Sequence, residues 1–280
     1  MSTLAYPPDV ESQIAEKAVM VTSRAARWRL RLELMRNLAV RDVETRYKHS
    51  LLGLYWAIIN PLVTAGIFSF VFQVIFHASS KPIPYVVFLL SGLTFWNFFT
   101  NGMMSATVSV SGNAALLAKI YFPRVVLPTA AILARLIDFA FSALILLVFI
   151  VLYRVPVHWT LVFLPLVLLV QIGFTLGVGF IVAALNVLYR DVTQLVGLLL
   201  MAWFYFSPIM YRITVVPARI RPFLLLNPMG ATVEAERNLL FTGHLLHPHY
   251  LDAAVVSTVA VLAVGYWIFR RVEPLFAEVM

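Results

Sequence analysis

Residues 159–185 read WTLVFLPLVLLVQIGFTLGVGFIVAAL, and no charged side chain interrupts these 27 residues. A helix needs about 20 mostly apolar residues to cross the hydrocarbon core of a bilayer. Lipid offers the backbone no hydrogen-bond partner, so a helix is required, whereas a membrane β-barrel would show short alternating segments. The whole chain agrees, since 61% of its 280 residues are hydrophobic and 12% are charged. The sequence therefore predicts an all-α integral membrane protein.

Five further apolar runs extend this pattern along the chain. We expect six membrane-spanning helices at about 55–76, 84–107, 126–152, 159–185, 192–211 and 251–269. Cytoplasmic flanks of such helices gather Lys and Arg. With the N-terminus inside, 14 of the 21 Lys and Arg residues fall on the cytoplasmic side and six outside, with Arg135 inside a span. Both termini are predicted to be cytoplasmic, and the net charge of +8 reflects orientation rather than nucleic-acid binding.

The segment 24–50 follows an N-terminal extension, 1–23, that has no apolar core typical of a signal peptide. A stripe of apolar and aromatic residues recurs every three or four positions in it: Trp28, Leu32, Met35, Ala39, Val43 and Tyr47. This spacing predicts an amphipathic helix lying on the cytoplasmic leaflet. A solvated charged linker is the alternative.

Two other segments do not span. The cytoplasmic segment 112–124 can gather apolar residues on one helical face and ends near Pro123, which favours a short docking helix, with interfacial anchoring as the alternative. The outer segment 212–250 is rich in proline, and its apolar piece is too short to span. Two short re-entrant helices dipping into the outer leaflet would suit it, provided that they pack against protein or water. Residues 273–280 are expected as a cytoplasmic tail.

Arg135 and Asp138 are the two charges well inside a predicted span. They are spaced i,i+3 on one helix and can form an ion pair. Charges at this depth usually face the bundle interior or water. An internal structural pair and a contact to an anionic head group or gate both remain open.

Aromatic residues gather at 95–99 and again at 203–211. Trp and Tyr favour membrane interfaces, which is the default explanation. The alternative is that they line a path for sugars, since flat rings stack on the apolar faces of pyranoses. Under that alternative the candidate channel-lining residues are Trp56, Phe95, Trp96, Phe99, Tyr205, Phe206 and Tyr211.

Several chemistries find no support in the sequence. No glycine is followed by lysine, so the phosphate-cradling GxxxxGK[ST] loop is missing, and a second polypeptide must supply ATP hydrolysis if transport uses it. There is no cysteine. Three histidines, His244, His247 and His249, cluster outside, but Pro248 prevents one helix from aligning them, so no metal site is predicted. We expect no catalytic residue, because Asp191 and Glu44 are isolated, which argues against a glycosyltransferase or acyltransferase.

Particular motifs resemble those of type-2 ABC transporter permeases that export polysaccharides. They cover about residues 30–272, and their order and spacing are more specific than any one of them. They are RDVETRYKHSLLGLYW at 41–56, NPL at 60–62, SGLTFW at 91–96, KIYFP at 119–123, YRD at 189–191, FSPIMY at 206–211 and NPM at 227–229.

The resemblance implies a permease subunit of a bacterial inner-membrane exporter for lipid-linked O-antigen, capsule, teichoic acid or galactan. It implies a homodimer that binds two copies of an ATPase subunit, with ATP and Mg²⁺ on that partner and no cofactor on this chain. A type-2 permease that exports a drug or small lipid shares the fold and is the alternative. The deciding feature between them is whether a continuous aromatic-lined tunnel or a closed apolar seam joins the two subunits.

The resemblance also implies roles for two cytoplasmic segments. The segment 24–50 resembles a gate helix, and residues expected at the lipid head-group entrance are Trp28, Arg41, Arg46, Tyr47 and Lys48. Guanidinium groups there would suit a phosphate or pyrophosphate on the lipid carrier. The segment 112–124 resembles a coupling helix, and the expected contacts with the ATPase are Asn113, Leu116, Leu117, Lys119, Ile120, Tyr121, Tyr189, Arg190 and Asp191.

Overall fold

The structure, a computed structural model, describes residues 24–47, 55–75, 77, 82–117, 122–245 and 248–276, and every regular element within them is helical. Five helical stretches are long and apolar enough to cross a membrane. These are Tyr55–Ile75 (α3, Tyr55–Ser69, with a π-helical turn, Phe70–Ile75), Tyr85–Ser109 (α4), Val126–Leu152 (α6), Trp159–Leu188 (a 3₁₀ turn, Trp159–Phe163, with α7, Leu164–Leu188) and Pro248–Leu275 (α11, Pro248–Val272, with a final 3₁₀ turn). The chain is therefore a multi-pass helical membrane protein.

The remaining expected span, 192–211, is shorter in the structure. Helix α8 covers Val192–Tyr205, which is 14 residues. At 1.5 Å per residue it extends about 21 Å, against about 30 Å of hydrocarbon. The helix ends two residues before Ser207, and Pro208 follows with a ring that cannot continue it. Apolar composition alone overestimated the helix, because residues 206–211 are apolar but form turns.

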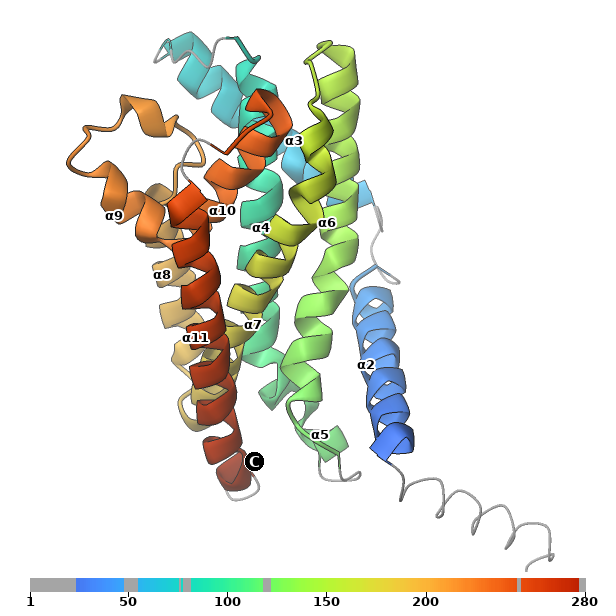
Figure 1. The fold of residues 1–280 in the computed structure, drawn as a ribbon. Coiled ribbons are helices and arrows are strands. Elements are labelled where there is room, and N and C mark those ends of the chain that lie inside the picture. Colours follow the sequence, from blue (N-terminus) through green and yellow to red (C-terminus); the bar gives the residue numbers. More distant parts are fainter. Residues whose placement is uncertain are drawn as a thin grey trace, which may run out of the picture.

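Helix α4 lies at the centre of the bundle and packs against α3, α6, α7, α8 and α10. Its side chains fill the main core, including Phe88, Leu89 and Leu93. The helices around it keep one side exposed, as expected when lipid is the surrounding solvent. Figure 1 shows α4 behind α10 and between α8 and α6.

Helices α7 and α11 approach each other closely through two glycines. A Cβ atom added at Gly265 would collide with the carbonyl oxygen of Gly177, and one added at Gly177 would collide with the backbone of Leu262. Small residues at such crossings let helix backbones pack tightly in membranes. This contact fixes the last helix against the bundle.

Helix α2 (Arg24–Tyr47) packs along α6, and Figure 1 shows it running beside the lower half of that helix. Its packed face differs in part from the predicted stripe. Leu34, Met35 and Leu38 pack against the core, whereas Leu32 is 57% exposed. The carboxyl end of α2 reaches the middle of α6, so the helix lies along the bundle rather than across it. The side chains of Trp28 and Tyr47 lie outside the described residues.

The segments expected on the cytoplasmic side gather at one end of the bundle. Figure 1 shows the start of α2, the short helix α5 (Ala114–Leu117) and the carboxyl end of the chain at the lower end. At the other end lie α9 (Arg221–Leu226) and α10 (Pro228–Arg237), two short helices within the expected outer segment. A 3₁₀ turn, Ser111–Asn113, precedes α5, and residues 118–121 lie outside the description. The arrangement agrees with the predicted grouping of the loops.

Candidate functional site

A cluster of charges joins the end of α2 to the middle of α6. Arg46 and Arg135 share one oxygen of Asp138, at 2.7 and 3.2 Å, and Arg46 also contacts Asp42 at 2.7 Å. Arg135 donates from Nε to the hydroxyl of Ser105 on α4, at 2.7 Å. The side chains of Arg46, Arg135 and Asp138 are only 16–21% exposed. The predicted ion pair therefore forms, and a residue of the expected gate helix completes it.

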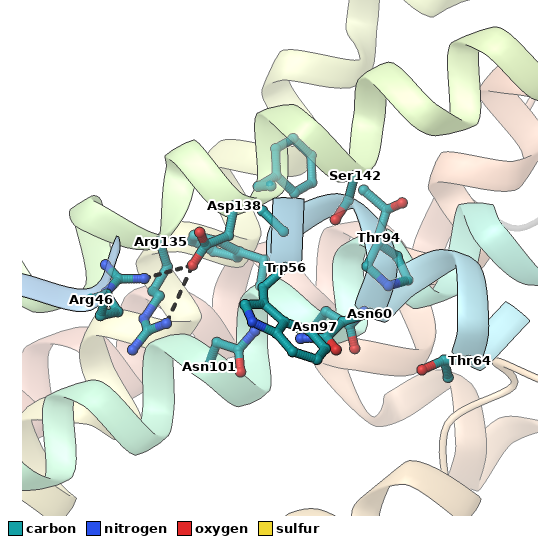
Figure 2. Close-up of a pocket in the computed structure, with 14 residues that line it drawn as sticks. Arg46, Trp56, Asn60, Thr64, Thr94, Asn97, Asn101, Arg135, Asp138 and Ser142 are labelled. Atoms are coloured by element: carbon teal, nitrogen blue, oxygen red, sulfur yellow. Dashed lines mark hydrogen bonds and ion pairs between the residues drawn. The ribbon is translucent and has the colours of Figure 1, made fainter. Parts of the chain in front are cut away.

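A polar cavity of about 470 Å³ opens beside this cluster, between α3, α4 and α6. Figure 2 shows the Trp56 ring among Asn60, Asn97 and Asn101, with the charged residues at one end of the group. The cavity also carries hydroxyl groups, from Thr64, Thr94 and Ser142. Its size lies within the range of about 300–1,000 Å³ that small-molecule sites occupy.

The three asparagine side chains of the cavity keep their hydrogen-bonding capacity. Within the part of the chain that the structure describes, no hydrogen bond joins the side-chain amides of Asn60, Asn97 or Asn101 to another residue. Asn60 and Asn101 are exposed and Asn97 is half-buried. None of the three asparagines was predicted as a site residue from the sequence. The available signal was the i,i+4 spacing of Asn97 and Asn101 in an otherwise apolar helix, which places two amides on one face.

A second cavity, of about 520 Å³, lies on the other side of α3, against α4 and α8. Its lining is mostly apolar and includes Phe68, Trp96 and Tyr205. Thr64 and Asn97 line both cavities. The two cavities therefore lie on either side of the contact between α3 and α4 that these two residues make up.

The predicted channel-lining residues separate into two groups. Phe95 and Phe99 are at most 1% exposed and pack on Phe139 and Phe174, so neither ring is open to a passing chain within this subunit. In the second group, Trp56 lines the first cavity, and Trp96 and Tyr205 line the second. Phe206 is exposed and Tyr211 is half-buried. The hydroxyl of Tyr211 donates to the backbone oxygen of Tyr205 at 3.0 Å.

The cytoplasmic residues predicted to meet an ATPase lie partly within the description. Arg41 on α2 donates to Oδ1 of Asn113 at 2.5 Å, which ties α2 to the start of the expected coupling segment. The turn at Arg190 and Asp191 between α7 and α8 is exposed, and so is Tyr189. Leu117 packs against the core. Four predicted residues lie outside the description, in whole or by their side chains: Leu116, Lys119, Ile120 and Tyr121. The same holds for Lys48 of the expected entrance.

A second group of charges, buried at the outer end, was not anticipated. Arg237 at the end of α10 donates to the backbone oxygens of Pro208, of Phe88 at 3.0 Å and of Ile209 at 2.6 Å. Its guanidinium also lies 3.7 Å from the centre of the Phe88 ring. It fastens α10 to the start of α4 and to the turn after α8.

Its neighbour Glu236 is fully buried. Burial raises the pKa of the Glu236 carboxyl to about 8. Arg237 and Ser91 favour the ionised form, but their effect on the pKa is smaller than that of burial, and neither carboxyl oxygen has a partner in hydrogen-bonding geometry among the described residues. The group is therefore largely protonated at neutral pH.

Comparisons with known proteins identify the family that this chain resembles. The family model described as ABC-2 type transporter matches residues 33–241. An O-antigen export system permease protein RfbA from Klebsiella pneumoniae is 31% identical over 242 residues, which cover 86% of this chain and 92% of that protein. An RfbA from Myxococcus xanthus is 30% identical over 247 residues, covering 88% and 94%. The polysialic acid transport protein KpsM from Escherichia coli is 26% identical over 245 residues, covering 84% and 92%.

Proposed function

The chain belongs to the ABC-2 type transporter family, and on that premise we propose that it is the permease subunit of an ATP-driven polysaccharide exporter. Its cargo is a lipid-linked glycan of the O-antigen or capsule type, which it moves across the bacterial cytoplasmic membrane. The observation that carries the proposal is the similarity to RfbA over 86% of the chain and 92% of that protein. This favours a polysaccharide over a drug or small lipid as the substrate class.

The proposed topology has six crossings and cytoplasmic termini. Helix α8 starts at the end of the bundle where α7 finishes, and α11 starts at the opposite end. We propose that α8, together with the turns of 206–211, makes the crossing between them. We place α9 and α10 as re-entrant helices at the outer end, where α10 packs against α4 and α11 and α9 packs against α11.

Two copies of the chain form the conduit. A glycan cannot cross lipid unaided, because each unpaired hydroxyl group costs several kcal/mol in hydrocarbon. Helices α3 and α8 flank the aromatic second cavity and carry exposed apolar residues, among them Ile67 and Leu198. We propose that these two helices face their counterparts in the partner copy. Trp96, Tyr205 and Phe206 then line the passage, and their rings offer weak contacts that tolerate a repeating chain.

A separate ATPase subunit drives the movement, with ATP and Mg²⁺ bound there. We propose that it contacts residues 112–124 and the turn at Tyr189, Arg190 and Asp191. The hydrogen bond from Arg41 to Asn113 passes a displacement of that segment to α2. Arg46 then carries it to the middle of α6 through Asp138. Helix α2 thereby serves as a gate near the lipid head-group entrance, where arginines suit the phosphate of a lipid carrier.

The test is genetic and biochemical. We expect deletion of the gene to abolish the surface polysaccharide while lipid-linked glycan accumulates on the cytoplasmic side. Complementation should require both this chain and an ATPase subunit with an intact catalytic site, so a complex with a catalytically inactive ATPase is the matched control. The purified chain alone should hydrolyse no ATP in nanodiscs. Unchanged surface polysaccharide after deletion would refute the proposal.

A further inference from the structure

The cavity beside Trp56 presents three side-chain amides that have no hydrogen-bond partner among the described residues. Asn60 comes from α3, and Asn97 and Asn101 come from one face of α4. Asn97 and Asn101 lie within a helix long and apolar enough to span the membrane. An amide left without a hydrogen bond in an apolar environment costs about 1–3 kcal/mol by protein mutational data. Three of them facing one space supply a polar molecule there with hydrogen-bond donors and acceptors.

The donors and acceptors of the cavity match hydroxyl groups rather than an anion. Each side-chain amide has two N–H donors and an accepting oxygen, and the hydroxyl groups of Thr64 and Ser142 both donate and accept. Sugar hydroxyls have the same dual character. A phosphate only accepts, and the cations at one end of the cavity, Arg46 and Arg135, already share Asp138. The larger, amide-lined part therefore favours a neutral, hydroxyl-rich ligand.

The aromatic residue of the cavity supports the same class of ligand. The ring of Trp56 is 44% exposed and lies among the amides in Figure 2. A broad ring face packs against the C–H face of a pyranose, while hydrogen bonds form around the rim of the sugar. The volume of about 470 Å³ leaves room for such a unit.

On this geometry we propose that the cavity between α3, α4 and α6 is a sugar-binding site, which holds one neutral pyranose unit of the glycan through Asn60, Asn97, Asn101 and Trp56. The inference rests on the proposed function, since the cargo must carry sugars. The charged end at Arg46 and Arg135 lies toward the phosphate of the carrier. Because Thr64 and Asn97 also line the aromatic cavity, the bound unit passes to that cavity between α3 and α4.

The test measures lipid binding by the complex of the chain with its ATPase subunit in nanodiscs. The probes are a polyprenyl diphosphate carrying one N-acetylglucosamine and the same polyprenyl diphosphate without sugar. We expect the wild type to bind the sugar-bearing lipid about tenfold more tightly, as two or three net hydrogen bonds predict. The double variant Asn97→Leu, Asn101→Leu should lose this preference and keep its affinity for the bare lipid. Thr107→Val is the matched control on α4, because that hydroxyl bonds to the Met103 backbone outside the cavity.

A second measurement uses the wild type and avoids a folding defect in the variant. A diazirine on the N-acyl group of the sugar should label peptides that contain Trp56, Asn60 or Asn97. Labelling confined to the lipid-facing side of α11 would overturn the site. Equal affinity of the wild type for both probes would also overturn it. If light scattering showed that the subunits of the double variant separate, the amides would serve the contact between the two copies, and the sugar site would again be wrong.

The sugar site and the proposed function fail in different ways. If the double variant restores surface polysaccharide to a deletion strain at the wild-type level, the sugar site is wrong and the exporter stands. If deletion leaves the polysaccharide unchanged, the exporter itself is wrong, whatever the binding results.

Discussion

Two arginine sites within the bundle differ in what surrounds them. Arg237, at the end of α10, is buried, gives most of its donors to backbone oxygens and one to the hydroxyl of Ser91, and lies against Phe88. Beside the middle of α6, the half-buried Arg46 and Arg135 share one carboxylate, and a polar cavity opens next to them. Residue type alone does not separate them. An arginine whose donors end on the backbone holds the fold, whereas arginines beside unused hydrogen-bonding groups mark a place where something binds or moves.

The largest expected effect comes from Arg237→Ala. The change removes the donor that the backbone oxygens of Pro208 and Ile209 have in the structure, and each unsatisfied group costs about 1–3 kcal/mol, while the Phe88 oxygen keeps the hydroxyl of Ser91. We expect a loss of more than about 3 kcal/mol in the free energy of unfolding, so that little folded protein is recovered in fluorescence-detected size-exclusion chromatography. Arg219→Ala, an exposed arginine of the same outer segment, is the control and should behave as wild type. Normal recovery of the Arg237 variant would show that this arginine does not hold the fold.

Gly92→Ala tests the same site through crowding. A Cβ atom at this position would collide with Nη2 of Arg237 and force the guanidinium to shift. Overpacking of this kind costs about 1–3 kcal/mol, which should appear as a lower thermal unfolding midpoint in detergent. At Gly66 on α3 an added Cβ meets nothing within 4 Å, so Gly66→Ala is the matched control. Equal midpoints for the two variants would contradict the role of Gly92.

Asp138→Asn tests the site beside the middle of α6. Arg46 and Arg135 would lose the carboxylate that they share, and their like charges would remain close. We expect an unfolding cost of about 1–2 kcal/mol and a fall in surface polysaccharide of at least about tenfold. Asp252→Asn, at an exposed position on α11, should change neither.

A double-mutant cycle sharpens this result. Adding Arg46→Gln to Asp138→Asn removes one of the two like charges that would remain close together, so the double variant should be less damaged than the sum of the single changes. Strict additivity would mean that the two side chains do not act together.

A change in pH dependence is expected at Glu236, the buried neighbour of Arg237. In the unfolded chain this carboxyl has an ordinary pKa of 4.5, and burial raises its pKa to about 8 in the folded protein. The folded state therefore binds more protons between these values, and stability falls as the pH rises from about 4.5 through 8. Glu236→Gln should remove that decline and raise the unfolding midpoint at pH 8.5. Glu44→Gln, at an exposed position on α2, should keep the wild-type slope. A wild-type midpoint that rises with pH over this range would refute the assignment.

Much of the fold follows from local composition, and the exceptions have physical reasons. Apolar runs located five spans, because the cost of exposing polar groups to lipid acts on each helix separately. The same criterion overestimated the length of α8, because apolar residues can also form turns. Periodicity predicted an amphipathic helix at 24–50 with Leu32 in its apolar stripe. The side that packs against the core carries Leu34, Met35 and Leu38 instead, because a stripe read from the sequence does not report that α6 is the neighbour of the helix.

For the candidate site too, some contacts follow from the local sequence and others depend on the tertiary structure. The spacing of Arg135 and Asp138 indicated a pair within one helix, and four residues are enough to see it. Arg46 is 92 residues away from Asp138 in the chain, and no local pattern reports such a contact. Phe95 and Phe99 belonged to an aromatic cluster that suggested a channel lining, but packing against neighbouring helices buried both.

The sequence by itself determined that this chain lies in a membrane, where most of its helices begin and end, and to which transporter family it belongs. These properties depend on the free energy of transferring each segment into lipid and on motifs that are contiguous in the chain. Only the tertiary structure decided which polar groups are satisfied and which are left facing a cavity. Whether an Asn or Arg has a partner depends on residues that folding brings from other helices, so Arg237 became a structural anchor and the amides of α3 and α4 became a candidate binding site.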